Sequence, residues 1–436
     1  MKKVVSDFKK ESYWQESMVS LGAYDERHQL AIYPEYQGQI IHGFGGAFTE
    51  AAGWCFQKLT DKEQAQFLQA YFGESGLRYT MGRTHMNSCD FSLENYACAS
   101  CAEGSFQMER DNQYILPLIH KAQQVAGKPI FLLLSPWSPP AFMKSNGEMN
   151  HGGKLLPQYR ELWAKWMACY VQGYQKAGCH IQMISVQNEP AAVQTWDSCI
   201  YSGTEEGEFA VSYLRPALDS IGAQDVGILV WDHNKDLLVR RAVESMKVAG
   251  AQKAISGFAF HWYSGDHFEA LDCTNKLFPD KELWFTEGCV EYCLFGDRKG
   301  FDNARMYAHD LIGNLAHGAN VCLDWNLLLD HKGGPNHVGN FCEAPIMLRE
   351  DGGFIINPSY YAIGHFSRYI HCGAVRLSSS IYTHLLESVV FRNPDNSKVA
   401  VILSRATEAL PVWVTEDGKT GYSVQIEPES LTTLIW

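Results

Sequence analysis

The sequence predicts an α/β fold in which a (β/α)8 TIM barrel carries an attached β-sandwich domain. Along most of the chain, short apolar runs alternate with helical patterns, and this alternation indicates a parallel sheet with crossover helices. After about Tyr361 the pattern changes to short strand-like segments separated by turn residues, which is typical of an all-β module. The length of 436 residues agrees with both observations. One barrel needs roughly 250 residues or more, which leaves room for a small second domain.

Eight apolar runs account for the strands of the predicted barrel, which we place at residues 40–365. Between the third and fourth runs, apolar side chains from Leu162 to Tyr174 recur at helical spacing, and Gly178 follows them as a stop signal. An earlier helix begins at a capping box formed by Thr60 and Glu63. The eight runs are Gln39–Ile41, Arg78–Met81, Ile130–Leu134, Ile181–Val186, Ile228–Trp231, Gly257–Phe260, Leu283–Phe285 and Asn320–Leu323.

The remaining residues, 1–39 and 366–436, are predicted to form one β-sandwich. The N-terminal segment contains a strand pattern at Gln29–Tyr33 but is too short to fold as a domain, so we expect it to pair with the C-terminal strands. Those strands are predicted at Val375–Leu377, Ser388–Phe391, Lys398–Leu403, Leu410–Val414 and Thr432–Trp436.

Composition excludes several classes of partner. The formal net charge of −13 would repel phosphate backbones, so nucleic acid is not an expected ligand. No stretch approaches the ~20 apolar residues of a membrane span. The 13 cysteines are odd in number and scattered, and the first residues lack the apolar run of a signal peptide. These features favour reduced thiols and a cytoplasmic location; the oligomeric state stays open.

Two glutamates follow predicted barrel strands directly. Glu189 follows the fourth apolar run and Glu287 follows the seventh, and catalytic groups of such barrels lie where the strands end. An ionised carboxylate at the end of an apolar strand is costly unless a partner or a substrate meets it. Two such carboxyls suggest glycoside hydrolysis, in which one protonates the leaving oxygen and the other attacks the anomeric carbon. The alternative is that both belong to the 49 acidic residues that solvate the surface.

Seven sequence motifs favour the catalytic interpretation. In their order along the chain they resemble glycoside hydrolase family 30, and most closely its glucosylceramidase branch. The resemblance extends from about residue 40 to residue 370 and continues more weakly through the C-terminal strands. The motifs are His42–Glu50, Ser88–Ser92, Ser135–Pro139, Lys144–Gly147, His261–Tyr263, Asp324–Asn326 and Gly333–Asn336.

The resemblance implies a retaining β-glycosidase in which Glu189 is the general acid/base and Glu287 the nucleophile. It implies that Asn188 binds the sugar 2-hydroxyl, and that Arg83 and Tyr263 contact the nucleophile. A cation and a phenol donor would keep Glu287 ionised, whereas the pKa of Glu189 must be raised for it to carry a proton.

The resemblance also implies the walls of a glucose pocket. Asp90 and Trp137 match residues that bind the hydroxyls far from the scissile bond, Trp325 matches an aromatic wall, and Asn340 matches a further polar contact. Other interpretations stay open for two of the residues: Arg83 could be a structural ion-pair partner and Trp325 could belong to the barrel core.

The loop after Glu189 departs from the pattern of the glucosylceramidase branch. It is shorter and reads Thr195–Cys199, in which Trp196 could form the wall beside the leaving group. This departure puts a ceramide-type leaving group in doubt. The expected substrate is a β-linked glycoside or oligosaccharide ending in glucose. The alternatives are a β-1,6-glucanase, a β-xylosidase or β-fucosidase of the same family, and a catalytically silent sugar-binding protein.

No cofactor or metal is expected. Cys98 and Cys101 form a single pair without a second one, and His331 with His337 has no recognised metal spacing. The glycines at 43–46 do not complete a dinucleotide-binding loop, and we interpret them as a tight turn under the sugar site.

Overall fold

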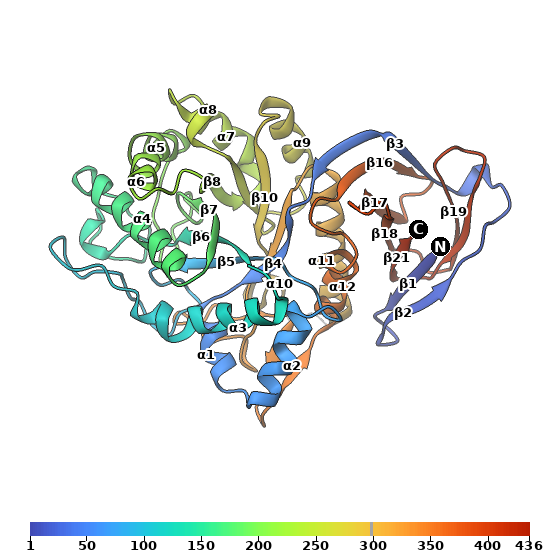
Figure 1. The fold of residues 1–436 in the computed structure, drawn as a ribbon, viewed down its shortest axis with the longest axis horizontal. Coiled ribbons are helices and arrows are strands. Elements are labelled where there is room, and N and C mark those ends of the chain that lie inside the picture. The colour runs from blue at the N-terminus through green and yellow to red at the C-terminus, as the bar shows by residue number, and fades with distance from the viewer. Residues whose placement is uncertain (297–299) are drawn as a thin grey trace.

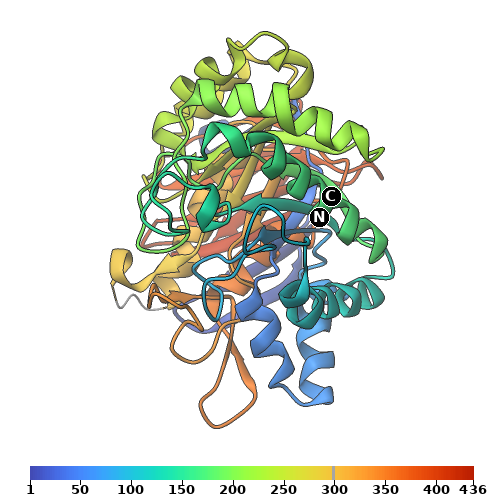
Figure 2. The ribbon, with the colours of Figure 1, turned by 90° about the vertical axis from the view of Figure 1, so that its left-hand side faces the viewer.

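The computed structural model describes residues 1–296 and 300–436 and contains both predicted parts (Figure 1). Within these residues, eight parallel strands close a barrel in the order β10, β12, β4, β5, β6, β7, β8, β9. The turned view of Figure 2 places the sandwich behind the barrel. The barrel strands are β4 Gly43–Ala47, β5 Met81–Met86, β6 Phe131–Pro136, β7 His180–Ser185, β8 Gly227–Asn234, β9 Gly257–His261, β10 Glu282–Glu287 and β12 Val321–Asp324.

The first barrel strand differs from the prediction. The run Gln39–Ile41 lies at the end of β3 (Gln29–Ile40), whose Ile40 pairs with Val375 in the sandwich, and the glycine-rich segment predicted as a turn forms β4 instead. A Cβ atom on Gly45 would lie 2.1 Å from the carbonyl oxygen of Met81. The glycine therefore lets β4 approach β5 closely, and the close approach explains its place in a strand.

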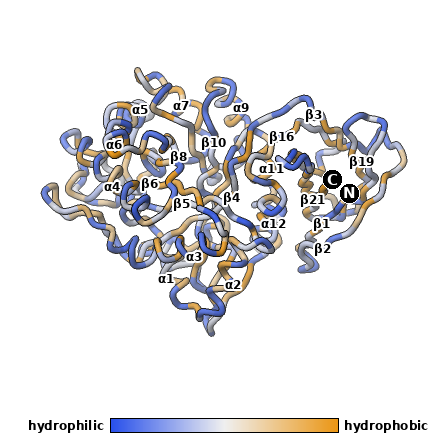
Figure 3. Tube along the Cα trace, viewed as in Figure 1, coloured by the Kyte–Doolittle hydropathy of each residue, from blue (hydrophilic) through white to orange (hydrophobic). Residues whose placement is uncertain are grey.

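Side chains from the strands fill the barrel interior, so the barrel is a core and not a channel. Figure 3 shows hydrophobic segments along the strands and hydrophilic segments in the outer loops. The buried interior cluster consists of Met81, Leu133, Met183, Leu229, Ala259, Trp284, Val321 and Leu323. Any site must therefore lie at one end of the barrel.

Helices cover the outside of the barrel. The predicted helix after the third strand is α4 (Arg160–Lys176), and the capping box at Thr60 and Glu63 begins α2 (Asp61–Phe72), so both predictions are confirmed. The other helices are α1 Glu50–Gln57, α3 Leu116–Ala126, α5 Gly203–Phe209, α6 Arg215–Ser220, α7 Leu238–Met246, α8 Ala251–Ala254, α9 Phe268–Leu277, α10 Tyr292–Phe295, α11 Gly300–Ala316 and α12 Pro358–Ser367.

The second part is a nine-stranded sheet that uses both ends of the chain. Its order is β2, β1, β21, β18, β17, β16, β3, β19, β20, and Lys2 of β1 pairs with Ile435 of β21. Apolar residues of β17 and β18 pack against α11 of the barrel. Besides β3, the strands are β1 Lys2–Asp7, β2 Ser12–Met18, β16 Val375–Ile381, β17 Leu386–Arg392, β18 Lys398–Ser404, β19 Leu410–Thr415, β20 Gly421–Ile426 and β21 Ser430–Ile435.

Two short two-stranded antiparallel sheets lie beside the barrel. Strand β11 (Val290–Glu291) pairs with β13 (Cys342–Glu343), and β14 (Ile346–Leu348) pairs with β15 (Phe354–Ile356). The β11–β13 pair matters for the site, because it ties the segment after β10 to the segment after β12. Among the described helices, none combines the length and the apolar character needed to cross a bilayer.

Candidate active site

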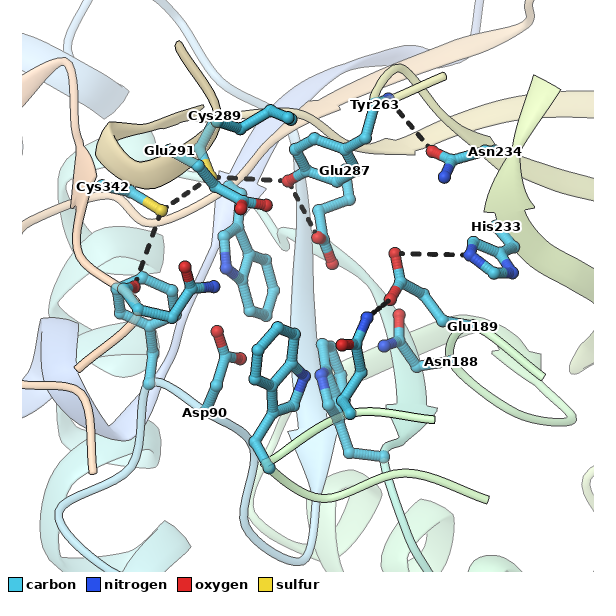
Figure 4. Close-up of a pocket in the computed structure, with 17 residues that line it drawn as sticks. Asp90, Asn188, Glu189, His233, Asn234, Tyr263, Glu287, Cys289, Glu291 and Cys342 are labelled. Atoms are coloured by element: carbon cyan, nitrogen blue, oxygen red, sulfur yellow. Dashed lines mark hydrogen bonds and ion pairs between the residues drawn. The ribbon is translucent and has the colours of Figure 1, made fainter. Parts of the chain in front are cut away.

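A pocket of about 250 Å³ opens at the end of the barrel where the strands finish (Figure 4). Its walls come from the C-terminal end of β8 and from residues at or after the ends of β5, β6, β7, β9, β10 and β12. This is the end where such barrels carry their active sites. Every predicted site residue except Arg83 lines this pocket, namely Asp90, Trp137, Asn188, Glu189, Trp196, Tyr263, Glu287, Trp325 and Asn340. The structure thus brings together residues that are up to 250 positions apart.

Glu189 and Glu287 face each other across the pocket. Their nearest carboxylate oxygens lie within 4.8 Å, and the two residues are 8% and 7% exposed. Arg83 Nη1 donates to one oxygen of Glu287 at 2.6 Å, and Tyr263 Oη donates to the other at 2.9 Å. Glu189 lies 3.3 Å from Nδ1 of His261 and accepts a weaker bond from Gln194 at 3.4 Å. His261 Nδ1 also lies 3.9 Å from Glu287, so this histidine is close to both carboxylates.

Arg83 lies beneath the pocket and is fully buried. Its Nη2 donates to Oδ1 of Asn188 and to Oδ2 of Asp232, both at 2.8 Å. The bond fixes the amide of Asn188 so that its oxygen is occupied and its nitrogen is left for a ligand. The guanidinium also lies 4.8 Å from the ring of Trp137. Arg83 is thus both a structural ion-pair partner and a contact of Glu287, so the two interpretations of the sequence do not exclude each other.

The far end of the pocket is built from Asp90 and two stacked indoles. The rings of Trp137 and Trp325 lie 5.1 Å apart at an interplanar angle of 20°. Asp90 is 5% exposed and accepts one long bond, from Nδ2 of Asn336 at 3.3 Å. Burial and the negative charges of Glu287 and its neighbours raise the pKa of Asp90 well above its ordinary value. A buried acid with one weak partner is free to bind a ligand hydroxyl.

The pKa values of the two glutamates shift in directions that differ from the expectation. Burial raises the pKa of Glu189, but the charge of His233 and the hydrogen bond and charge of His261 outweigh it and lower the pKa to about 2. Burial raises the pKa of Glu287, against the opposing charges of His261 and Arg83. The expected raised pKa of Glu189 is therefore wrong for this structure, because two histidines lie beside this carboxylate.

Because of His261, the free energy of unfolding is predicted to fall as the pH rises into the alkaline range. Burial lowers the pKa of His261, but the charge of Glu287 and the bonds to Asp232 and Glu189 outweigh it and raise the pKa to about 9. The folded protein then holds a proton that the unfolded chain releases near pH 6.5. This contribution is complete below about pH 6.5 and disappears as the pH rises through about 9.

The expected loss is on the order of 3 kcal/mol in the free energy of unfolding. Urea titrations at several pH values measure it for the wild type and for His261→Gln, which should have a flatter profile. His151→Gln, at a histidine whose side chain is 58% exposed, is the matched control and should keep the wild-type profile. An identical pH profile for His261→Gln would contradict this role.

Comparison with known proteins agrees with this geometry. Residues 41–370 match the family model described as "Glycosyl hydrolase family 30 TIM-barrel domain", and residues 373–434 match the "Glycosyl hydrolase family 30 beta sandwich domain". The chain belongs to glycosyl hydrolase family 30. The family 30 assignment makes it a glycoside hydrolase.

Relatives of this family 30 enzyme include several hydrolases. The lysosomal acid glucosylceramidase of Mus musculus is 33% identical, over 93% of this chain and 83% of that protein. An endo-1,6-β-D-glucanase of Aspergillus fumigatus is 24% identical, over 91% of this chain and 85% of that protein. Among solved structures, SrfJ from Salmonella typhimurium is 41% identical with a TM-score of 0.96, covering 100% of this chain and 99% of that one.

Several residues of the site in this family 30 enzyme were not predicted from the sequence, among them Asp232, His261 and Glu291. Asp232 ends the apolar part of β8, so the same strand-end rule that identified Glu189 could have found it. His261 stood in a quoted motif without a role. Glu291 lines the pocket, and burial together with the charges of Glu189 and Glu287 raises its pKa to about 7. No signal in the sequence marked Glu291, because the two-residue strand β11 and not a barrel strand carries it.

Proposed function

We propose that this family 30 protein is a retaining exo-β-glycosidase that hydrolyses a terminal β-linked glucose. The spacing of Glu189 and Glu287, with nearest oxygens within 4.8 Å, carries the proposal. Retaining enzymes hold their carboxyls about 5–5.5 Å apart, whereas inverting enzymes need about 6.5–9.5 Å to accommodate a water. The short spacing supports direct attack by a carboxylate on the sugar.

In this mechanism Glu287 attacks the anomeric carbon while Glu189 protonates the leaving oxygen. Arg83 and Tyr263 hold both oxygens of Glu287, which orients the nucleophile and favours its charged form. Water then attacks the glycosyl-enzyme from the side of Glu189, which acts as the base in this second step. Asn188 accepts the bond from Arg83 through its Oδ1 atom. Its amide nitrogen is therefore available to bind the sugar 2-hydroxyl.

The proposed mechanism requires a proton on Glu189 and a negative charge on Glu287. Of the cations around the pair, Arg83 beside Glu287 keeps its charge at all relevant pH values. Arg83 favours the ionised form of Glu287. His261, whose pKa is raised to about 9, lies 3.3 Å from Glu189 and favours the ionised form of that carboxylate as well. The proposed mechanism therefore requires substrate binding to raise the pKa of Glu189.

The stereochemistry of hydrolysis tests the proposal directly. Proton NMR of 4-nitrophenyl β-glucoside hydrolysis should show β-glucose as the first product, with α-glucose appearing later by mutarotation. Retention follows from two successive displacements at one carbon. First appearance of α-glucose would overturn the proposed mechanism.

Asp90 is predicted to set the sugar preference. A buried group that binds a hydroxyl penalises a substrate lacking it by about 1–3 kcal/mol, because the group is left unpaired. Glucoside should therefore be cleaved faster than xyloside, which lacks the C6 hydroxymethyl group. Asp90→Ala should reduce kcat/KM for the glucoside about 10- to 100-fold and for the xyloside much less.

The measurement compares 4-nitrophenyl β-glucoside, β-xyloside and β-fucoside on the wild type and Asp90→Ala. Asp351→Ala, at an exposed acid, is the control and should leave all three values unchanged. If xyloside or fucoside is the better substrate of the wild type, or if Asp90→Ala slows all three equally, the glucose assignment fails while the catalytic pair can stand.

One observation favours a second, more specific candidate, a glucosylceramidase-like activity. Leu294 lines the active-site pocket and is 54% exposed, and together with Tyr263 it also lines an adjoining pocket of about 390 Å³ that includes Trp262 and Met306. This apolar continuation could take an alkyl chain, although Trp196 replaces the aromatic pair expected in that branch. Glucosylceramide should then be cleaved faster than a β-1,6-linked glucose disaccharide; the reverse order would indicate a glucanase.

A further inference from the structure

Two free thiols in the pocket wall lie unusually close together. The Sγ atoms of Cys289 and Cys342 are 3.1 Å apart, and both cysteines line the active-site pocket (Figure 4). Their residues are 1% and 0% exposed. Cys289 follows β10, the strand of the predicted nucleophile, and Cys342 begins β13. The two thiols therefore lie on the segments that the antiparallel pairing of β11 with β13 holds side by side.

The thiol pair contacts the predicted catalytic machinery. Cys289 Sγ lies 3.4 Å from Oη of Tyr263, and the same Oη donates to Glu287 at 2.9 Å. A continuous chain of contacts therefore runs from Cys342 through Cys289 and Tyr263 to the nucleophile, as the dashed lines in Figure 4 show. Any change in the position of Cys289 sulfur changes the surroundings of Tyr263.

We propose that Cys289 and Cys342 form a redox-modification site, at which a hydroperoxide converts the two thiols into a disulfide that lowers the hydrolase activity. Both thiols face the pocket, which gives a small oxidant its path. In a reducing compartment, disulfides are typically transient and serve redox sensing. The consequence for activity rests on the proposed function, whereas the disulfide itself does not.

The reaction balances with one peroxide. One thiolate attacks a peroxide oxygen, the O–O bond breaks, and the sulfur becomes a sulfenic acid while hydroxide leaves and takes up a proton. The second thiol then attacks the sulfenic sulfur, an S–S bond forms, and a second water leaves. The two thiols lose two electrons and two protons in total, and hydrogen peroxide is reduced to two molecules of water.

The buried environment of the two thiols slows their oxidation, so that only a strong or sustained oxidant should convert them. Burial raises the pKa of Cys342 to about 11 and that of Cys289 well above its ordinary value. Because the thiolate is the reactive species, the rate should increase with pH. Reaction at neutral pH is slow, so brief exposure leaves the enzyme reduced.

Disulfide formation must bring the two sulfurs closer together. A disulfide bond is about 2.05 Å long, so the sulfurs must approach each other by roughly 1 Å from their present 3.1 Å. Any part of this movement made by Cys289 changes its 3.4 Å contact with Tyr263, which binds the predicted nucleophile. A displacement of about 1 Å near reacting groups can cost about 100-fold in rate, so we expect oxidation to lower kcat about 10- to 100-fold.

The test oxidises the full-length enzyme with hydrogen peroxide at pH 7 and pH 9, and follows activity on 4-nitrophenyl β-glucoside. After blocking the remaining thiols and digesting without reductant, peptide mass spectrometry should show a Cys289–Cys342 link that forms faster at pH 9. Activity should fall in parallel and return with dithiothreitol. Each variant is compared with its own reduced activity. Cys342→Ala should resist reversible inactivation, and Cys372→Ala, which removes an exposed thiol, should behave as the wild type.

The mass and activity measurements separate the possible failures. If the wild type forms no Cys289–Cys342 link, or links Cys289 to the exposed Cys293 instead, the modification site is wrong. If the link forms without a change in activity, the inhibitory effect is wrong. If the protein cleaves none of the glycosides, the proposed function fails while the link still decides the site. Linkage in the wild type is measurable even if Cys342→Ala does not fold.

Discussion

Glu287→Gln should reduce kcat/KM for aryl β-glycosides by at least about 1,000-fold, because an amide cannot displace the leaving group. The substitution keeps the shape of the side chain, and Arg83 retains its ion pair with Asp232 at 2.8 Å, so the fold should persist. The measurement is kcat/KM for 4-nitrophenyl β-glucoside beside a thermal unfolding curve. Glu350→Gln, at an exposed glutamate, is the matched control and should keep full activity.

Azide rescue distinguishes the two predicted roles. Azide should not rescue Glu287→Gln, because the amide still fills the space of the nucleophile. In Glu287→Gly, azide can enter that space and attack, which gives an α-glucosyl azide after one displacement. In Glu189→Gly, azide should attack the glycosyl-enzyme and give the β-azide. Near wild-type activity of Glu287→Gln, or a β-azide from Glu287→Gly, would contradict the nucleophile assignment.

The strand-end rule explains why much of the site could be predicted from the sequence. In a parallel barrel every strand ends at the same side, so Glu189 and Glu287 had to meet even though 97 residues separate them. Apolar runs fixed seven of the strand positions to within a few residues, because strands buried on both faces need continuous apolar segments. The family motifs then supplied the pocket walls, including Asp90 and Trp137.

The first barrel strand, β4, was not predicted because its residues do not have the usual composition of a strand. Glycines 43, 45 and 46 favour a turn in any local analysis, and only the neighbouring strand explains them. A Cβ on Gly45 would meet the carbonyl of Met81, which no local pattern can reveal. Tertiary packing therefore overrode local propensity at β4.

The charge state of the site also could not be predicted from the sequence. The pKa of Glu189 depends on His233 and His261, which come from β8 and β9 and reach this carboxylate only in the folded barrel. Asp232 holds His261 at 3.1 Å and Arg83 at 2.8 Å, so a single buried acid connects both sides of the pair. The direction of a pKa shift depends on distances between side chains in the folded protein, and the order of residues along the chain does not give these distances.

Arg83→Met should lower the free energy of unfolding by about 3–5 kcal/mol, because removing one partner of a buried ion pair leaves an uncompensated charge. Arg83 is fully buried and is the cation for both Asp232 and Glu287. Activity should also fall, since Glu287 loses the donor at 2.6 Å that orients it. Urea unfolding followed by tryptophan fluorescence gives the change in stability, provided the m-value stays constant.

Two comparisons identify the buried charge as the cause. Arg305→Met removes an exposed arginine whose pair with Asp302 has both side chains more than 40% exposed, and it should cost less than about 1 kcal/mol. Adding Asp232→Asn to Arg83→Met should recover part of the stability, because the unpaired carboxylate is then gone. The deficit of Arg83→Met should also shrink as the pH falls and the orphaned carboxylates take up protons. A deficit equal to that of Arg305→Met, with no pH dependence, would mean that Arg83 acts through packing and not through its charge.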